Sequence, residues 1–480
     1  MFDFLKKLES AKTNIASLDE IAMLLKTSPE TLAQFEDAYR NMALDQSTES
    51  DSIFDMNSRD AAKVMREGDK GDTSDLVASI TKRAVDELVA QTNCLNISKQ
   101  KITAHKLIAP PSSPLKNEDL RALPVSLRPQ VTGSLMQVDT SGQSFVAVLE
   151  MYKKAQEASD PKKRAQFYGM FRQGLDILDL DSVLYEMLSM NPNSMSQWLP
   201  AISKAAWKYG FFQIPETKIV KVPLTLLQLT RMEYGNLTRT TLDIVDQWAM
   251  KAFDLDVTKS YFIKTGTYSS KFDFRNAKVT SEKEVRELGE YLLFIHHQAI
   301  RMAGPLFSPC IYGVSTTNEW VVREYIEDKE NNPCIYKGMP LHTEYRVFVD
   351  FDTDEVLGYT PYWRPDVMLK RFSQGAENSQ HDYHDYLIYK AHEETLMGRY
   401  NENVATVVEH VKEMIPSVDL SGQWSIDIMQ NGDDFWLIDM ATADTSALND
   451  CVPREKLKKH EENWLPDFSS RLPEHKENDL

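Results

Sequence analysis

Apolar residues recur at three- and four-residue steps in the first hundred residues of the chain, which is the spacing of amphipathic helices. Residues 18–44 (LDEIAMLLKTSPETLAQFEDAYRNMAL) show this spacing, and Ser28 with Pro29 suits a helix cap and first turn. Residues 73–93 (TSDLVASITKRAVDELVAQTN) show it again after a polar break. The pattern therefore predicts a helical N-terminal region over residues 1–108.

A proline-rich segment, residues 109–124 (APPSSPLKNEDLRALP), follows this region. Proline fits neither a helix interior nor a sheet ladder, so we expect a linker or an ordered loop. Helical spacing returns over residues 142–188 and is followed by a polar break. Residues 109–205 are therefore predicted to be a linker followed by a helical region, with the main domain boundary near residue 205.

Short runs of alternating apolar and polar residues become frequent after residue 205, with helices expected at 240–255, 281–302 and 382–414. This mixture predicts a domain with an α+β fold and a mainly antiparallel sheet over residues 206–455. Residues 456–480 are expected to be an exposed C-terminal tail. The strand-like runs are SYFIKT, EWVVREYIE, EYRVFVDFD, EVLGYTPYW, WSIDIMQN and DFWLIDMAT.

Composition limits the location and the partners of the protein. The chain has 480 residues, enough for two to four domains, and its net charge of −18 argues against nucleic-acid binding. None of its four cysteines forms a CxxC pair, which argues against a zinc site of the usual spacing. Because neither a secretory signal nor a transmembrane run is evident, we expect a reduced, cytoplasmic protein without membrane contact.

Cations at strand ends are the first sign of chemistry. The apolar run YFIK ends on Lys264, and a polar loop with a second lysine, Lys271, follows at once. In the run EYRVFV, Glu344 and Arg346 are two residues apart and so face the same side of a strand. Taken alone, Lys264 also fits a solvated edge charge, and Arg346 a salt bridge within the sheet.

Two aspartates on a predicted hairpin suggest a metal site. The runs that contain Asp427 and Asp439 flank the turn sequence NGDD, which is a strong hairpin signal. An aspartate between apolar strand residues is costly unless it is paired or bound to a metal, and Mg²⁺ prefers oxygen ligands that it shares with phosphates. No GxxxxGK[ST] motif occurs, so the pattern predicts a nucleoside triphosphate site without a Walker loop.

The order of a lysine strand, a VVREYIE linker, an EYRVFV strand and an Asp–Asp hairpin resembles the ATP-grasp superfamily over residues 219–444. The chain is similar to its compact phage and bacterial clades, and to the eukaryotic cell-division-cycle proteins that assist assembly of a translation initiation factor. The resemblance implies ATP and Mg²⁺ as ligands. It also implies an ATP-dependent carboxylate–amine ligase that acts through an acylphosphate, and we expect its substrate to be a peptide or a protein.

The resemblance assigns a role to each matching residue. It places Lys264 and Arg346 at the ATP phosphates, where they would carry catalysis. The adenine-side linker would be Glu324, Tyr325 and Ile326, the ribose contact Glu327 or Asp328, and the magnesium ligands Asp427 and Asp439. Apart from the resemblance, we expect the polar loop that contains Lys271 to fold over the triphosphate.

One position departs from the family pattern. Ala441 stands where a third metal ligand, asparagine, is usual, and Asp444 or a water molecule would have to replace it. Three other functions therefore stay open. The protein could be an ATP-binding assembly module without turnover, or a structural protein with a decayed ATP-grasp fold. Phosphoryl or nucleotidyl transfer to a protein would use the same cations.

Overall fold

The computed structural model describes residues 73–113, 191–230, 237–303, 317–375 and 380–459, with shorter pieces between residues 115 and 188 and at residue 235. The expected helix at 18–44, most of the expected helical segment at 142–188 and residues 460–480 lie outside this part. Within it, helices and mainly antiparallel sheets form an α+β fold, as expected. No described helix has the length and apolar character needed to cross a membrane.

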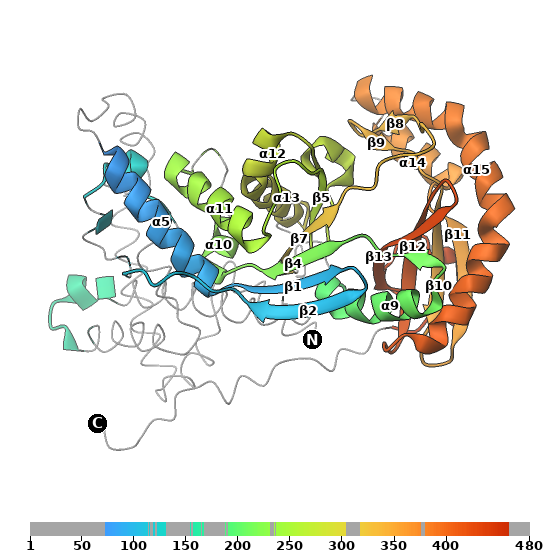
Figure 1. Cartoon of the computed structure of the whole chain (residues 1–480), viewed down its shortest axis with the longest axis horizontal. Coiled ribbons are helices and arrows are strands. Elements are labelled where there is room, and N and C mark those ends of the chain that lie inside the picture. The colour runs from blue at the N-terminus through green and yellow to red at the C-terminus, as the bar shows by residue number, and fades with distance from the viewer. Residues whose placement is uncertain are drawn as a thin grey trace, which may run out of the picture.

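A six-stranded sheet crosses the middle of the molecule (Figure 1), and all its described pairings are antiparallel. Its strands, in spatial order, are β2 (Lys101–Lys106), β1 (Asn93–Ser98), β4 (Thr217–Lys221), β7 (Glu319–Glu324), β5 (Tyr261–Thr265) and β6 (Lys278–Val279).

A five-stranded sheet lies at the right in Figure 1. A small two-stranded sheet pairs β8 with β9 near it. The order in the five-stranded sheet is β11 (Glu355–Pro361), β10 (Glu344–Asp350), β12 (Gln423–Asn431), β13 (Asp434–Thr442) and β3 (Phe212–Gln213), and the small sheet contains β8 (Cys334–Ile335) and β9 (Met339–Pro340). Only the short β3 pairs in parallel among these described strands, along β13.

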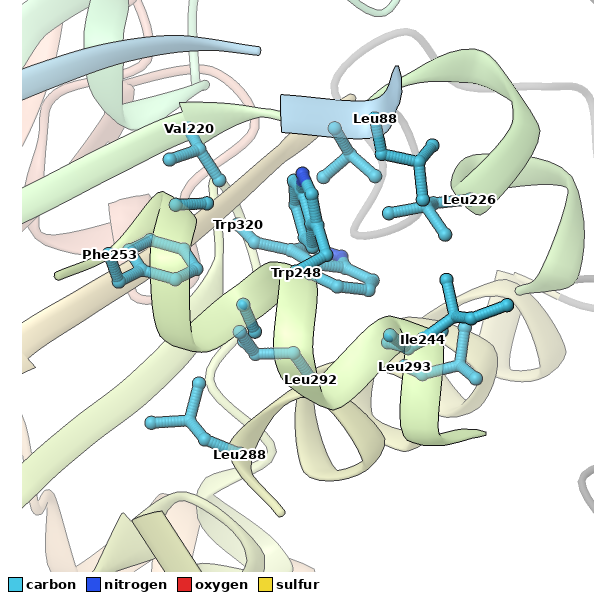
Figure 2. Close-up of a cluster of buried hydrophobic side chains, with 14 of the residues drawn as sticks. Leu88, Val220, Leu226, Ile244, Trp248, Phe253, Leu288, Leu292, Leu293 and Trp320 are labelled. Atoms are coloured by element: carbon cyan, nitrogen blue, oxygen red, sulfur yellow. The ribbon is translucent and has the colours of Figure 1, made fainter. Parts of the chain in front are cut away.

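Helices cover one face of the six-stranded sheet and enclose the first core (Figure 1). Trp248 and Trp320 pack edge to face at its centre, with ring centroids 5.5 Å apart (Figure 2). Their indole nitrogens donate hydrogen bonds to Thr92 and His296. The helices here are α5 (Ser74–Ala90), α10 (Leu224–Leu229), α11 (Arg239–Ala252), α12 (Glu282–Arg286) and α13 (Leu288–Ala303).

The second core joins the two sheets. Helix α9 (Met195–Tyr209) and the long helix α15 (Gln380–Met414) pack against β10, β12 and β13, and Ile219 and Val321 of the six-stranded sheet enter the same cluster. This shared core fixes one sheet against the other. The remaining helices are α14 (Pro365–Gly375) and the 3₁₀ turns η1 (Val125–Leu127), η4 (Lys271–Asn276), η5 (Ile415–Ser417) and η6 (Asn449–Cys451).

The expected helices at 73–93, 281–302 and 382–414 are present as α5, as α12 with α13, and as α15. A fully helical N-terminal region was a wrong prediction, because residues 93–106 form the hairpin β1–β2. Its turn residues, Lys99 and Gln100, both have positive φ, but they are not the Asn-Gly type that marks such turns in a sequence.

The domain boundary near residue 205 stays a prediction. In the described structure, α9 runs through residue 205. Strand β1, before this residue, also pairs with strand β4, after it, in the six-stranded sheet. The two adjacent histidines of α13 differ in burial. His296 is buried and accepts the indole hydrogen bond of Trp320.

Candidate functional site

A pocket opens between the two sheets, and strands of both sheets form its walls. Lys264 comes from β5, Arg323 and Glu324 from β7, and Asp427 and Asp439 from the hairpin β12–β13. Lys264 and Asp439, which meet in this pocket, are 175 positions apart in the chain. Its further lining residues are Pro215, Phe262, Ser269, Lys271, Phe274, Tyr325, Ile326, Met339, Pro340, His342, Glu344, Tyr362, Trp363, Met429 and Ile438.

Asp427 and Asp439 lie directly opposite each other on β12 and β13, and both line the pocket. Like charges placed opposite each other in a sheet destabilise it unless cations offset them. A β-bulge follows Asp427 in this ladder, which changes the strand's path at the site. The hairpin therefore places two carboxylates next to each other, as the turn signal suggested.

Arg346 offsets the charge of Asp427. The two residues face each other on β10 and β12, and the guanidinium makes two parallel hydrogen bonds of 2.7 Å to the two carboxylate oxygens. Burial opposes the charge of the guanidinium, but the carboxylate of Asp427 raises the pKa of Arg346 above its ordinary value. Arg346 also donates to the carbonyl oxygen of Ala447.

Lys264 offsets the charge of Asp439. Its ammonium lies 3.1 and 3.0 Å from the two carboxylate oxygens, and the residue is 1% exposed. It is therefore not a solvated edge charge, because β5 lies between β7 and β6. A lysine buried this deeply needs an anionic partner, and Asp439 provides it from the other sheet.

Among the cations of the site, Arg323 has the weakest signal in the sequence. It is buried in β7, where Nε donates to Thr217 and Nη1 donates to the carbonyl oxygen of Ile438. Its Nη2 has no hydrogen-bond partner among the described residues. Burial lowers the pKa of Arg323 to about 10, although Asp439 acts in the opposite direction. The run WVVR has the same form as YFIK, an apolar strand interrupted by a cation, and this likeness could have identified it.

Lys271 and Glu344 occupy the wall between these ion pairs and two aromatic side chains. The ammonium of Lys271 lies 4.1 Å from the centroid of the Tyr362 ring. Burial lowers the pKa of Lys271 and raises the pKa of Glu344. The sequence pattern did not predict Glu344 as a site residue, because it marks Glu344 only as a residue on the same strand face as Arg346.

Aromatic and aliphatic side chains make the rest of the wall. Glu324, Tyr325 and Ile326, the expected adenine-side linker, all line the pocket here. The ammonium of Lys278 lies 3.9 Å from the centroid of the Tyr325 ring. The backbone N–H groups of Glu324 and Tyr325 already donate to carbonyl oxygens of the protein, so these two amides do not face a ligand.

Glu327 and Asp328 are not part of the pocket wall. Asp328 holds the following turn instead, since its carboxylate accepts hydrogen bonds from the backbone of Glu330 and Asn332. Asp328, Glu330 and His342 could hold a metal ion by their spacing alone. Arg399, however, lies 3.3 Å from Glu330 and supplies a positive charge there. The ribose contact therefore stays a prediction to which the pocket lends no support.

Ala441 lies on β13 opposite Ser425, and its methyl group offers no metal ligand. Asp444, the expected substitute, does not line the pocket among the described residues. The basic segment that follows β11, residues 364–371, runs into the helix α14. Its Arg364 is paired with Asp366 and Asp450.

Comparisons with known proteins are sparse. No protein-family model matches the chain, and no curated protein matches it. Two structures of Cdc123 from Schizosaccharomyces pombe, one of them C-terminally truncated, are distant structural neighbours. Each is 14% identical, and the truncated and full forms have TM-scores of 0.32 and 0.31. The matches cover 57% and 58% of this chain, and 95% and 96% of the neighbours. A likeness of this size carries no weight for function, which has to rest on the pocket.

Proposed function

We propose that this chain binds ATP with Mg²⁺ in the pocket between its two sheets and acts as an ATP-dependent carboxylate–amine ligase. The observation that carries the proposal is the set of side chains in and next to the pocket wall. Three cations, two adjacent aspartates and a set of aromatic and aliphatic side chains line the pocket, and Arg346 does not line it but is paired with the lining residue Asp427. A nucleotide has the matching parts, because its base is flat and largely apolar and its phosphates are anionic.

The cations of the pocket suit an anionic ligand. Lys264, Lys271 and Arg323 line it and Arg346 adjoins it through Asp427, and the four carboxylates of Glu324, Glu344, Asp427 and Asp439 balance these four charges when all are ionised. The Nη2 atom of Arg323 adds a buried donor without a described partner. A buried guanidinium nitrogen without an acceptor is costly, and a bound phosphate would satisfy it.

The carboxylates of Asp427 and Asp439 fit a magnesium ion by their chemistry, since both are oxygen ligands and they are neighbours across the hairpin. When bound, Mg²⁺ neutralises phosphate charge during transfer of the γ-phosphoryl group. Lys264 and Arg346 would hold the phosphates in place and stabilise the negative charge that develops on them. No general base is required of this chain for a carboxylate nucleophile that is already ionised.

A second function, ATP binding without turnover in a module that grips a partner protein, is favoured by Ala441. With that residue in place of a third ligand, the hairpin β12–β13 offers the metal the two carboxylates of Asp427 and Asp439. A metal that is held more loosely would still help ATP to bind, but it would position the phosphates less firmly.

Calorimetric titration of MgATP into the full chain tests the binding site. We expect micromolar binding by the wild type, and a loss of about tenfold or more in Lys264→Met and in Asp439→Asn, since each removes a charged partner. Lys329→Met is the matched control, because Lys329 is an exposed lysine paired with Asp434 outside the pocket. Absence of ATP binding by the folded wild type would exclude the proposal.

Turnover separates the two functions. The protein is incubated with MgATP, hydroxylamine and a mixture of tryptic peptides, which offers many carboxylates. A ligase releases ADP and forms hydroxamates, because hydroxylamine intercepts the acylphosphate. Binding of ATP without ADP release under these conditions would favour the partner-gripping module.

A further inference from the structure

The two carboxylates expected to hold magnesium are already engaged by cations. Both oxygens of Asp427 accept from Arg346, and both oxygens of Asp439 lie within 3.1 Å of the Lys264 ammonium. Asp439 also accepts the backbone N–H of Met440. A divalent ion that approached these oxygens would meet two positive charges that already occupy them.

The Arg346–Asp427 and Lys264–Asp439 ion pairs differ in their position in the fold and in their exposure. Arg346 and Asp427 are neighbours within one sheet, and their side chains are 11% and 9% exposed. Lys264 reaches Asp439 from the other sheet, and the Asp439 side chain is 41% exposed. The Lys264–Asp439 pair therefore spans the pocket between the sheets, and one of its partners is open to solvent and to an incoming ligand.

We propose that the magnesium site of this pocket forms only when a polyphosphate is bound, because the phosphates draw Lys264 and Arg346 away from Asp439 and Asp427. The inference rests on the nucleotide-binding function proposed above. A polyphosphate carries several negative charges and strong acceptor oxygens, so it can replace the carboxylates as the partner of both cations. The released carboxylates of Asp439 and Asp427 would then be available as oxygen ligands for the metal.

The charge around the pocket supports this order of events. The four cations and four carboxylates there balance, so a divalent ion alone would add two uncompensated positive charges in a poorly solvated space. A polyphosphate supplies the negative charge that a divalent ion then offsets. Coupling of this kind is reciprocal, so the metal must also raise the affinity for the polyphosphate by the same factor.

The test measures metal binding without turnover, using Mn²⁺ as the probe. The electron paramagnetic resonance signal of free Mn²⁺ reports how much metal is bound by the full-length protein in the absence of nucleotide. We expect no binding by the wild type up to millimolar Mn²⁺. Lys264→Met, which leaves Asp439 without its cation, should bind Mn²⁺ at least about tenfold more tightly than the wild type.

Arg346→Met should show the same gain through Asp427. Lys264→Met remains the primary variant, because Asp439 is 41% exposed and tolerates the loss of its partner, whereas Asp427 is nearly buried. Adding Asp427→Asn to Lys264→Met should remove the gained site. Arg83→Met is the matched control, since it removes an arginine paired with Asp119 outside the pocket and should gain no metal binding.

Calorimetry with ATP and with inorganic tripolyphosphate completes the test. Both should bind the wild type with EDTA present, and more tightly with Mg²⁺, whereas in Lys264→Met this difference should shrink. The inference would be overturned if the wild type without nucleotide bound Mn²⁺ as tightly as Lys264→Met does. It would also be overturned if the wild type bound ATP with equal affinity in Mg²⁺ and in EDTA. Either result would leave nucleotide binding standing. A wild type that binds no ATP under either condition would instead overturn the proposed function.

Discussion

Replacement of Arg323 by methionine separates binding from stability more cleanly than any other change in the pocket. The guanidinium is 4% exposed and donates to Thr217 and to the carbonyl oxygen of Ile438, which joins β7 of one sheet to β13 of the other. Methionine has a similar length and no charge, so it fills most of the same space without the hydrogen bonds.

Opposing contributions keep the expected change in the free energy of unfolding small. The two lost hydrogen bonds to a charged group are each worth about 1.5–3 kcal/mol. Burial, however, lowers the pKa of Arg323 from 12.5 to about 10, which corresponds to a cost of roughly 3 kcal/mol for keeping the charge inside. The net loss of stability is therefore about 0–3 kcal/mol, and the protein should stay folded.

ATP affinity should respond differently. If Arg323 Nη2 donates to a phosphate, its removal costs about 1.5–3 kcal/mol of binding, which is about 10- to 100-fold in affinity. Urea unfolding and calorimetric titration of MgATP on the same sample measure the two quantities. An Arg323→Met protein that is folded and binds MgATP as tightly as the wild type would refute the assignment of Arg323 to the phosphates.

Four further variants test the fold. Gly289→Ala should destabilise the protein by about 1–3 kcal/mol in urea unfolding, because its new methyl group would lie 2.6 Å from a backbone oxygen of α11. Gly398→Ala, inside α15 with nothing within 4 Å, should instead stabilise by about 0.5–1 kcal/mol, and equal effects of the two would contradict this packing. Burial raises the pKa of Asp246 from 3.8 to about 8, so the folded state holds a proton that the unfolded state releases, and stability should fall as pH rises from about 4 to 8. Asp246→Asn should flatten that fall in urea titrations at pH 5 and 8, and an unchanged slope would disprove it. Replacing Lys99-Gln100 with Asn-Gly should raise the melting temperature, since both positions have positive φ, and a lower value would argue against this turn.

Strand alternation and turn signals were enough to predict the C-terminal sheet. The hairpin that carries Asp427 and Asp439 could be predicted because NGDD marks its turn and both flanking runs alternate. The hairpin at residues 93–106 could not, because Lys99 and Gln100 give no such signal and a strong helical pattern precedes it. Local sequence therefore identified elements wherever their turns used residues with a marked backbone preference.

The pocket was harder to predict, because its walls come from two sheets. Lys264 stood out as a cation at the end of an apolar run, and the structure adds what no local pattern contains, its partner Asp439 in the other sheet. Asp328 shows the reverse case. Its position in the chain suits a ligand contact, but its carboxylate is used by the turn that follows. A residue's partners across the pocket, not its neighbours in sequence, decide whether it faces a ligand.

Two polar links cross the pocket between the sheets, the Lys264–Asp439 pair and the hydrogen bond from Arg323 to the carbonyl oxygen of Ile438. Ile438 and Asp439 are adjacent on β13, so both links end at the same place on the five-stranded sheet. A polyphosphate that took Lys264 from Asp439 would remove one link and supply a new one through its own oxygens. Ligand binding at this site would therefore act on the joint between the two sheets. For that reason, the same two cations should govern nucleotide affinity and the rigidity of one sheet against the other.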